Sequence, residues 1–104
     1  MEKIADILKD RGSKYGDFRD QAAISQELKM IVWGAIGERS KRSTIDMHKG
    51  EHTQDLAPYQ LEALEMILHK IARILNGDPN YKDSWVDIVG YAQLVVDRLP
   101  EGSK

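Results

Sequence analysis

Residues 64–99 decide the fold, and they read LEMILHKIARILNGDPNYKDSWVDIVGYAQLVVDRL. Apolar side chains recur in this stretch at the three- and four-residue spacing of an α-helix, first up to Asn76-Gly77 and again from Asp83 onward. Asparagine and glycine commonly follow the last turn of a helix, and Pro79 lies in the connection between the two patterns. Because this connection is short, we predict two antiparallel helices joined as a hairpin.

Two further helical patterns precede this hairpin, and no strand-like alternation competes with them. Gly12 is expected to end the first helix, and Asp20 is expected to cap the second. The sequence therefore predicts an all-α fold with about four helices in a single domain over residues 1–104. The expected helices cover residues 4–11, 20–36, 58–76 and 83–99.

Residues 38–55 are expected to form a mobile loop, because Ile45 and Met47 are the only large apolar residues in this segment. The last two helices have wide apolar arcs, which indicate contacts on two sides. Those contacts are either with the other helices of one chain or with a second chain in a dimer. On the fourth helix, the side expected to be buried consists of Trp85, Ile88, Val89, Ala92, Val95, Val96 and Leu99.

Composition excludes several classes of protein. The 104 residues include 15 basic and 17 acidic side chains, and a net charge of -2 creates no global field that favours nucleic acid or an anionic membrane. The chain has no cysteine, which excludes disulfides and cysteine-bound zinc. No segment approaches the roughly 20 apolar residues of a membrane span. We therefore expect a cytoplasmic protein, and a homo-oligomer is expected because so short a chain buries only a modest core.

Paired carboxylates on the last two helices are candidate metal ligands. Asp83 and Asp87 are one helical turn apart, and Gly90 continues the same line. Glu62 and Glu65 form a similar pair on the preceding helix, and Mg²⁺ accepts carboxylates from two facing helices. The alternative is structural: the aspartates complement the positive end of the helix, the glycine allows close packing, and the glutamates are solvated.

Two groups of cations are candidate phosphate ligands. Lys70 and Arg73 either hold a phosphorylated ligand or bridge the aspartates of the next helix. Residues 11–18 contain two glycines, two cations including Lys14, and the ring of Tyr15. This combination is suited to bind a phosphate or to stack on a base, and it is equally compatible with a sharp turn anchored by an aromatic residue.

The same residues carry a resemblance to a known family. Four blocks resemble small phage and prophage proteins of unknown function, and that family is distantly similar to the all-α nucleoside triphosphate pyrophosphohydrolases of the MazG and dimeric dUTPase type. The resemblance covers nearly the whole chain and implies a dimeric, MazG-like helical bundle that binds a nucleotide with Mg²⁺ in a bacterial cytoplasm. The blocks are RGSKYGDF (11–18), EALEMI (62–67), KIARILNGD (70–78) and DSWVDIVGYA (83–92).

The resemblance also implies roles for individual residues. In those enzymes, a Glu-x-x-Glu pair and a Glu-x-x-Asp pair on successive helices bind Mg²⁺ at the triphosphate, and hydrolysis releases pyrophosphate. Here Glu62 and Glu65 match the first pair and Asp87 matches the last carboxylate, which makes all three catalytic and metal-binding residues. Ser84 stands where the remaining glutamate belongs, and Asp83, one position earlier, is the substitute ligand. The implied nucleotide-binding residues are Lys14, Tyr15, Lys70 and Arg73.

Ser84 also leaves a second function open, because a missing metal ligand weakens catalysis. In this alternative the chain is a non-enzymatic phage protein that binds a host or phage protein, for example to inhibit a defence system, through Trp33 and residues 38–55. Convergence of the cations and carboxylates of the hairpin on one cavity would favour the nucleotide. Ion pairs across the hairpin without a cavity would favour the protein partner.

Overall fold

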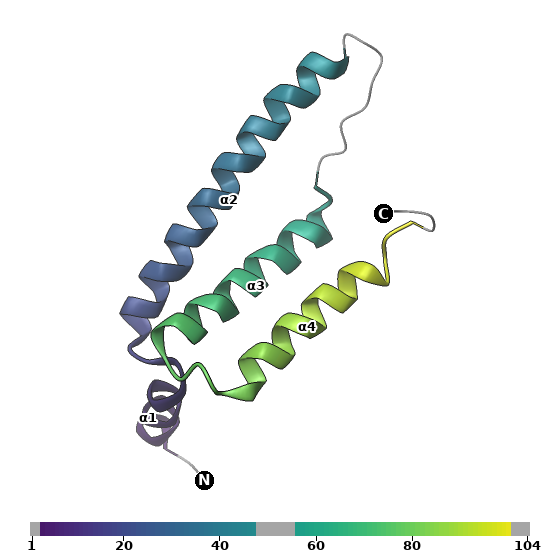
Figure 1. Ribbon diagram of the computed structural model, residues 1–104. Coiled ribbons are helices and arrows are strands. Elements are labelled where there is room, and N and C mark those ends of the chain that lie inside the picture. Colours follow the sequence, from purple (N-terminus) through teal and green to yellow (C-terminus); the bar gives the residue numbers. More distant parts are fainter. Residues whose placement is uncertain (1–2, 48–55, 101–104) are drawn as a thin grey trace.

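The computed structural model describes residues 3–47 and 56–100, with side chains described outside residues 40–47, and it contains four helices and no strand in these ranges (Figure 1). The predicted all-α class is confirmed, and the third helix has its predicted ends. No helix in the described part is long and apolar enough to span a membrane. The helices are α1 (Ile4–Tyr15), α2 (Phe18–Met47), α3 (Pro58–Asn76) and α4 (Lys82–Val96).

The helix α3 is the centre of a single layer (Figure 1). It contacts α2 on one side and α4 on the other, while α1 lies at one end of the layer against α2 and α3, and α2 and α4 make no contact within the described residues. A single layer of helices has no opposite layer to enclose a core. Ala63 and Ala72 are therefore the only buried apolar residues in the described part of the chain, whose extents are 60 × 29 × 24 Å.

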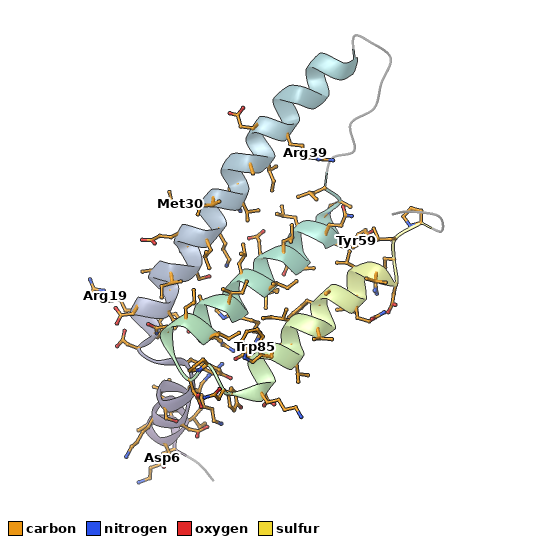
Figure 2. The ribbon with its side chains drawn as sticks, viewed as in Figure 1. Asp6, Arg19, Met30, Arg39, Tyr59 and Trp85 are labelled. Carbon is orange, nitrogen blue, oxygen red and sulfur yellow. The ribbon has the colours of Figure 1, made fainter. Side chains whose placement is uncertain are left out.

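The predicted hairpin of α3 and α4 is confirmed, and its helices are antiparallel. Near one end of the hairpin, the Tyr59 hydroxyl donates a hydrogen bond to the carbonyl oxygen of Arg98 at 3.4 Å (Figure 2). Further along, Lys70 Nζ lies 3.0 Å from Asp87 Oδ2. Residue numbers thus rise along one helix as they fall along the other.

The turn between α1 and α2 packs against the turn between α3 and α4 through two glycines. Gly16 has φ of 79° and ψ of -167°, a combination almost restricted to glycine. A Cβ atom on Gly16 would overlap the carbonyl oxygen of Asn76, and one on Gly77 would overlap the backbone of Lys14 and Tyr15. The two backbones therefore approach more closely than they could if either Gly16 or Gly77 carried a Cβ atom.

Hydrogen bonds complete this contact between the turns. The Asn76 side-chain amide donates to the carbonyl oxygens of Tyr15 at 3.0 Å and Asp17 at 2.9 Å. The Asp78 backbone N–H donates to the carbonyl oxygen of Lys14 at 2.8 Å. One side chain and one N–H thus bind three carbonyl groups at the end of α1 and the start of α2, which holds α1 against α3.

The predicted ends of the first two helices are wrong. The helix α1 continues through Gly12 to Tyr15, because glycine inside a helix costs only about 1 kcal/mol relative to alanine. The chain turns at Gly16, where φ is positive. The first turn of α2 is capped by Asp17, whose Oδ1 accepts the N–H of Asp20 at 3.2 Å, so the predicted cap is instead the donor.

The loop predicted over residues 38–55 is wrong for residues 38–47, which continue α2 as far as Met47. Extending an existing helix costs far less than starting one, so a polar segment rich in good helix formers needs no apolar face to remain helical. The rest of the predicted loop, residues 48–55, lies outside the described residues.

The predicted buried side of α4 is largely wrong. Among the described helices only α3 contacts α4, and the stripe of α4 residues with the least exposure is shifted by one position toward the N-terminus from the centre of the predicted side. These are Ser84, Ile88, Tyr91 and Val95, of which Ile88 and Val95 belong to the prediction. Trp85, Val89 and Val96 are 52%, 68% and 59% exposed, and Ala92 and Leu99 are exposed as well.

We expect Gly16→Ala to lower the free energy of unfolding by about 1–3 kcal/mol from the backbone conformation alone, with a further loss from overlap with Asn76. Gly90→Ala is the matched control, because a Cβ there meets nothing within 4 Å and the helix interior prefers alanine. Gly90→Ala should raise the free energy of unfolding by about 0.5–1 kcal/mol. Urea denaturation measures both, and equal effects of the two variants would contradict the role of the turn contact.

Candidate functional site

A cavity of about 610 Å³ lies where α1, α2 and α3 meet. Its wall combines two cations, one carboxylate, two aromatic rings, an amide and an aliphatic side chain, which is the mixture of apolar surface and a few polar groups found in small-molecule sites. The cavity adjoins the turn between α1 and α2, so the contact between the two turns positions it. The residues that carry these groups are Leu8, Arg11, Tyr15, Asp17, Phe18, Gln21 and Arg73, and the Asp17 carboxylate also accepts the backbone N–H of Asp20.

Arg73 is a cation without an acidic partner in the described part of the chain. Its guanidinium carbon lies 4.1 Å from the centroid of the Tyr15 ring, a cation–π contact that holds the planar group in place. Its Nε is buried and makes no hydrogen bond to any described residue. A buried donor without a partner costs free energy, and a guanidinium presents its N–H groups in the geometry that matches a phosphate or carboxylate. Arg73 is therefore oriented for an anion.

The region around Arg73 is electropositive, as His69 shows. Burial of this imidazole lowers its pKa, and nearby cations lower it further because they oppose a second positive charge. In order of decreasing effect on the pKa, the cations are Arg73, Lys70, Lys29 and Arg11.

Two polar side chains of α2 are buried within the layer. Gln21 is 4% exposed and lines the cavity, and its Nε2 lies 3.5 Å from Nδ1 of His69. Ser25, one turn further along α2, is 3% exposed, and its Oγ has no hydrogen-bond partner in the part of the chain that the structure describes. Buried polar atoms are normally paired, so this side of α2 holds more hydrogen-bonding capacity than the described residues satisfy.

Of the four residues predicted to bind a nucleotide, two line the cavity and two are engaged elsewhere. Tyr15 and Arg73 lie in the cavity wall. Lys14 Nζ lies 2.9 Å from Asp10 Oδ2 and 5.0 Å from the centre of the Tyr81 ring, and the hydrogen bond to Asp10 is the main reason that the pKa of Lys14 is raised. Lys70 is paired with an aspartate across the hairpin.

The two predicted aspartate ligands on α4 have partners of their own. Asp87 forms an ion pair with Lys70. The predicted alternative, in which Lys70 bridges to an aspartate of the next helix, therefore holds for this contact. Asp83 Oδ2 accepts a hydrogen bond from the Tyr81 hydroxyl at 3.0 Å. This bond is the main reason that the pKa of Tyr81 is raised, because ionising the phenol would place a negative charge beside the carboxylate. The aspartates therefore point to different neighbours.

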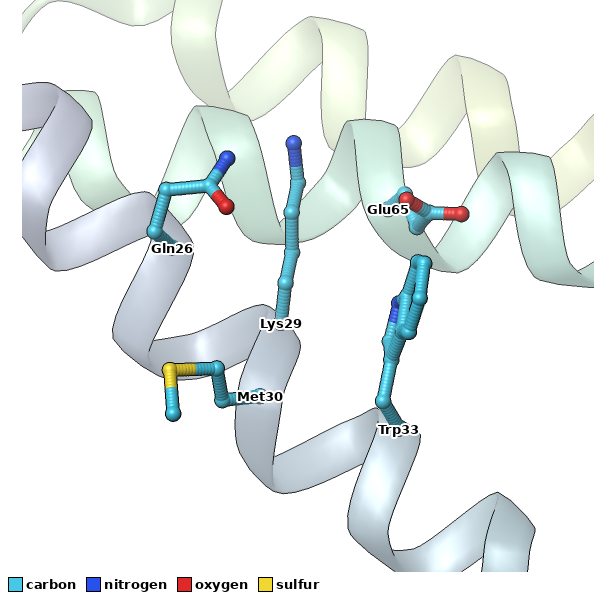
Figure 3. Close-up of a pocket in the computed structure, with 5 residues that line it drawn as sticks. All are labelled: Gln26, Lys29, Met30, Trp33 and Glu65. Atoms are coloured by element: carbon cyan, nitrogen blue, oxygen red, sulfur yellow. The ribbon is translucent and has the colours of Figure 1, made fainter.

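The two predicted glutamate ligands lie apart from those aspartates. Glu65 lines a separate pocket of about 400 Å³ between α2 and α3, toward which Lys29 and Trp33 extend from α2 (Figure 3). Glu62 is exposed to solvent. Within the described residues, no group of three or more histidine, cysteine, aspartate or glutamate side chains is placed to hold a metal ion. The four predicted ligands do not form such a group within the described residues of one chain, and Mg²⁺ binding stays a prediction.

Among the cavity residues, Arg11, Phe18 and Gln21 had no individual role in the sequence analysis. Arg11 and Phe18 lie in the block 11–18, whose combination of cations and rings pointed to this region. Gln21 was missed because the second helix was predicted to begin at Asp20. The helix α2 instead starts at Phe18, so Gln21 lies one turn after Phe18 and on the same helix face as Phe18.

A family model for a domain of unknown function, DUF6378, matches residues 1–98. The chain belongs to the DUF6378 family. The match contains both turns of the glycine contact and every residue of the cavity wall. The predicted membership in a family of unknown function is thereby confirmed, while the phage origin and the similarity to MazG-type enzymes stay predictions. No curated protein and no solved structure matches the chain.

The lowered pKa of His69 has a consequence for stability. An unfolded histidine titrates near pH 6.5, and the folded form binds its proton less readily, so protonation favours unfolding. We expect the stabilisation of the folded state by neutral His69 to be complete above pH 6.5. It should be lost as the pH falls through 6.5 toward the pKa of the folded form. Urea denaturation between pH 7.5 and pH 5 measures the loss.

The control for this prediction is His69→Gln, which keeps a polar side chain but cannot titrate. His48 and His52 remain in this variant, so the difference between the two pH profiles belongs to His69 alone. The stability of His69→Gln should fall less steeply with decreasing pH than that of the unmodified chain. Parallel profiles would contradict the assignment.

Proposed function

We propose that the domain binds a nucleotide, or a related phosphorylated molecule with an aromatic ring, in the cavity between α1, α2 and α3. The observation that carries this proposal is Arg73, whose guanidinium is held on the Tyr15 ring and whose buried Nε has no hydrogen-bond partner among the described residues. A phosphate oxygen is a strong hydrogen-bond acceptor. It also carries the negative charge that no acidic side chain supplies to Arg73 in the described part of the chain. The cavity volume of about 610 Å³ lies within the range of small-molecule sites.

In this proposal the cations of the cavity wall bind the phosphate and an exposed ring of the wall stacks on the base. Arg11 and Arg73 are the cations of the wall and would contact the phosphate oxygens. Phe18 is 75% exposed although it lines the cavity, so its face is free to stack on a base. Gln21 offers one amide donor group and one acceptor to the edge of that base. These four side chains come from three helices, so the site depends on the fold.

The proposal concerns binding and includes no metal-dependent step. The resemblance to MazG-type enzymes predicts Mg²⁺ and pyrophosphate release, with Glu62, Glu65, Asp83 and Asp87 as ligands. In one chain these carboxylates lie apart. Assaying pyrophosphate in the binding mixtures, with and without Mg²⁺, tests that prediction separately from binding.

Binding of another protein is the second candidate function, and one observation favours it. On α2, Met30, Ile31 and Trp33 are 71%, 72% and 62% exposed, in line with the predicted surface role of Trp33. Figure 2 shows Met30 on α2. Met30 and Trp33 are one turn apart and line the same pocket, whereas Ile31 lies on another side of the helix. Large apolar side chains that share a surface are typical of protein interfaces. Absence of nucleotide binding by the folded chain would leave this function as the stronger one.

We expect Arg73→Gln to weaken nucleotide binding by about tenfold or more, since a hydrogen bond to a charged group contributes about 1.5–3 kcal/mol. Isothermal titration with nucleoside mono- and triphosphates measures the effect. Lys14→Gln is the matched control. It also removes one positive charge, next to Tyr15 in the sequence, but this cation already pairs with Asp10. No heat with any nucleotide, or equal loss in both variants, would refute the proposed site.

Ligand binding should also raise the pKa of His69. The cations that lower this pKa would be partly neutralised by a bound phosphate, so the imidazolium becomes easier to form. We expect the His69 NMR titration to move to higher pH with saturating nucleotide and to stay in place with the uncharged nucleoside. An unchanged titration in the presence of a bound nucleotide would place the phosphate elsewhere.

A further inference from the structure

The helix α4 carries two parallel stripes of small and apolar residues, and only one of them has a partner among the described residues of the chain. Both stripes have the alternating four- and three-residue spacing of helices that pack side by side. The stripe that faces α3 consists of Ser84, Ile88, Tyr91 and Val95. The second stripe, about 100° further around the helix, consists of Trp85, Val89, Ala92, Val96 and Leu99, all of them exposed.

The exposed stripe continues onto α3. A shallow apolar groove of about 300 Å³ runs between the two helices and includes Leu64 and Ile67 from α3 and Ala92 from α4. Leu64 and Leu75, three turns apart on α3, are 38% and 65% exposed. We call the exposed stripe of α4 together with Leu64 and Leu75 the apolar face of the hairpin. It contains no charged residue.

The total surface of the chain shows how much is left uncovered. The chain exposes 8156 Å², whereas a compact monomer of 11.8 kDa exposes about 5,900 Å². Its radius of gyration is 17.7 Å, against about 13 Å for a compact domain of this length. The difference is larger than the roughly 800 Å² that each partner buries in a standard protein interface. It belongs to the chain as a whole, and the long helix α2 contributes to it as well as the apolar face.

We propose that a second copy of this chain packs against the apolar face of the hairpin. Two hairpins packed through these faces give each chain the opposite layer that its own helices lack, in the arrangement of a four-helix bundle. A two-fold contact brings identical surfaces together, and a face without charges does so without any like-charge repulsion. A chain with only two buried apolar residues in its described part also needs this burial for its own stability. The proposal is independent of nucleotide binding, because the cavity lies on α1, α2 and the opposite part of α3.

Sedimentation equilibrium of the full chain is the first test. We expect twice the mass of the 11.8 kDa chain at micromolar concentration, and a midpoint of thermal unfolding that rises with protein concentration. We expect Val89→Glu to weaken the dimer at least 100-fold, because each copy would bury an unpaired carboxylate. Leu94→Glu is the matched control: this residue is also half-exposed on α4, about 140° around the helix from Val89, and its replacement should leave the dimer intact.

A cross-linking experiment covers the case in which Val89→Glu fails to fold. The chain has no cysteine, so Ala92→Cys introduces a single thiol on the apolar face and Leu94→Cys introduces one off it. A short bismaleimide should link Ala92→Cys into covalent dimers and leave Leu94→Cys monomeric. A wild-type chain that is a cooperatively unfolding monomer at all concentrations, or a dimer cross-linked equally by both variants, would overturn the proposal.

Discussion

The rest of the structure depends on the contact between two turns. With no side chain at Gly16 or Gly77, the backbone between α1 and α2 meets the backbone between α3 and α4, and Asn76 and Asp78 bind the carbonyl groups exposed there. This contact holds α1 across the end of α3. It thereby places Tyr15 beneath Arg73 and creates the cavity wall, so the geometry of the candidate site follows from a backbone constraint.

The pairing of charges decides which cations are available to a ligand. Sequence spacing treats Lys14, Lys70 and Arg73 alike, as basic residues near a turn or on one helix. In the fold, Lys14 pairs with Asp10 and Lys70 pairs with Asp87, while Arg73 rests on an aromatic ring and has no acidic partner in the described part of the chain. Attraction to an anion is therefore concentrated in one corner of the layer, where the pKa of His69 is also lowered.

The layer arrangement separates two surfaces with different chemistry. The cationic cavity lies between α1, α2 and α3, and the apolar face lies on α3 and α4. The central helix belongs to both, because its residues face neighbours in several directions. A ligand in the cavity and a second copy on the apolar face would consequently bind without competing for the same side chains.

The sequence by itself determined the helical class, the ends of α3 and the antiparallel hairpin, because these depend on local periodicity and on Pro58, Asn76 and Gly77. It also pointed to Tyr15 and Arg73. Tertiary structure alone decided which apolar stripe of α4 is covered, since two adjacent stripes have the same spacing and only contact with α3 distinguishes them. It also decided that the four carboxylates lie apart and that Gln21 lines the cavity, because the pairing of charges and the direction of side chains depend on neighbours distant in the chain.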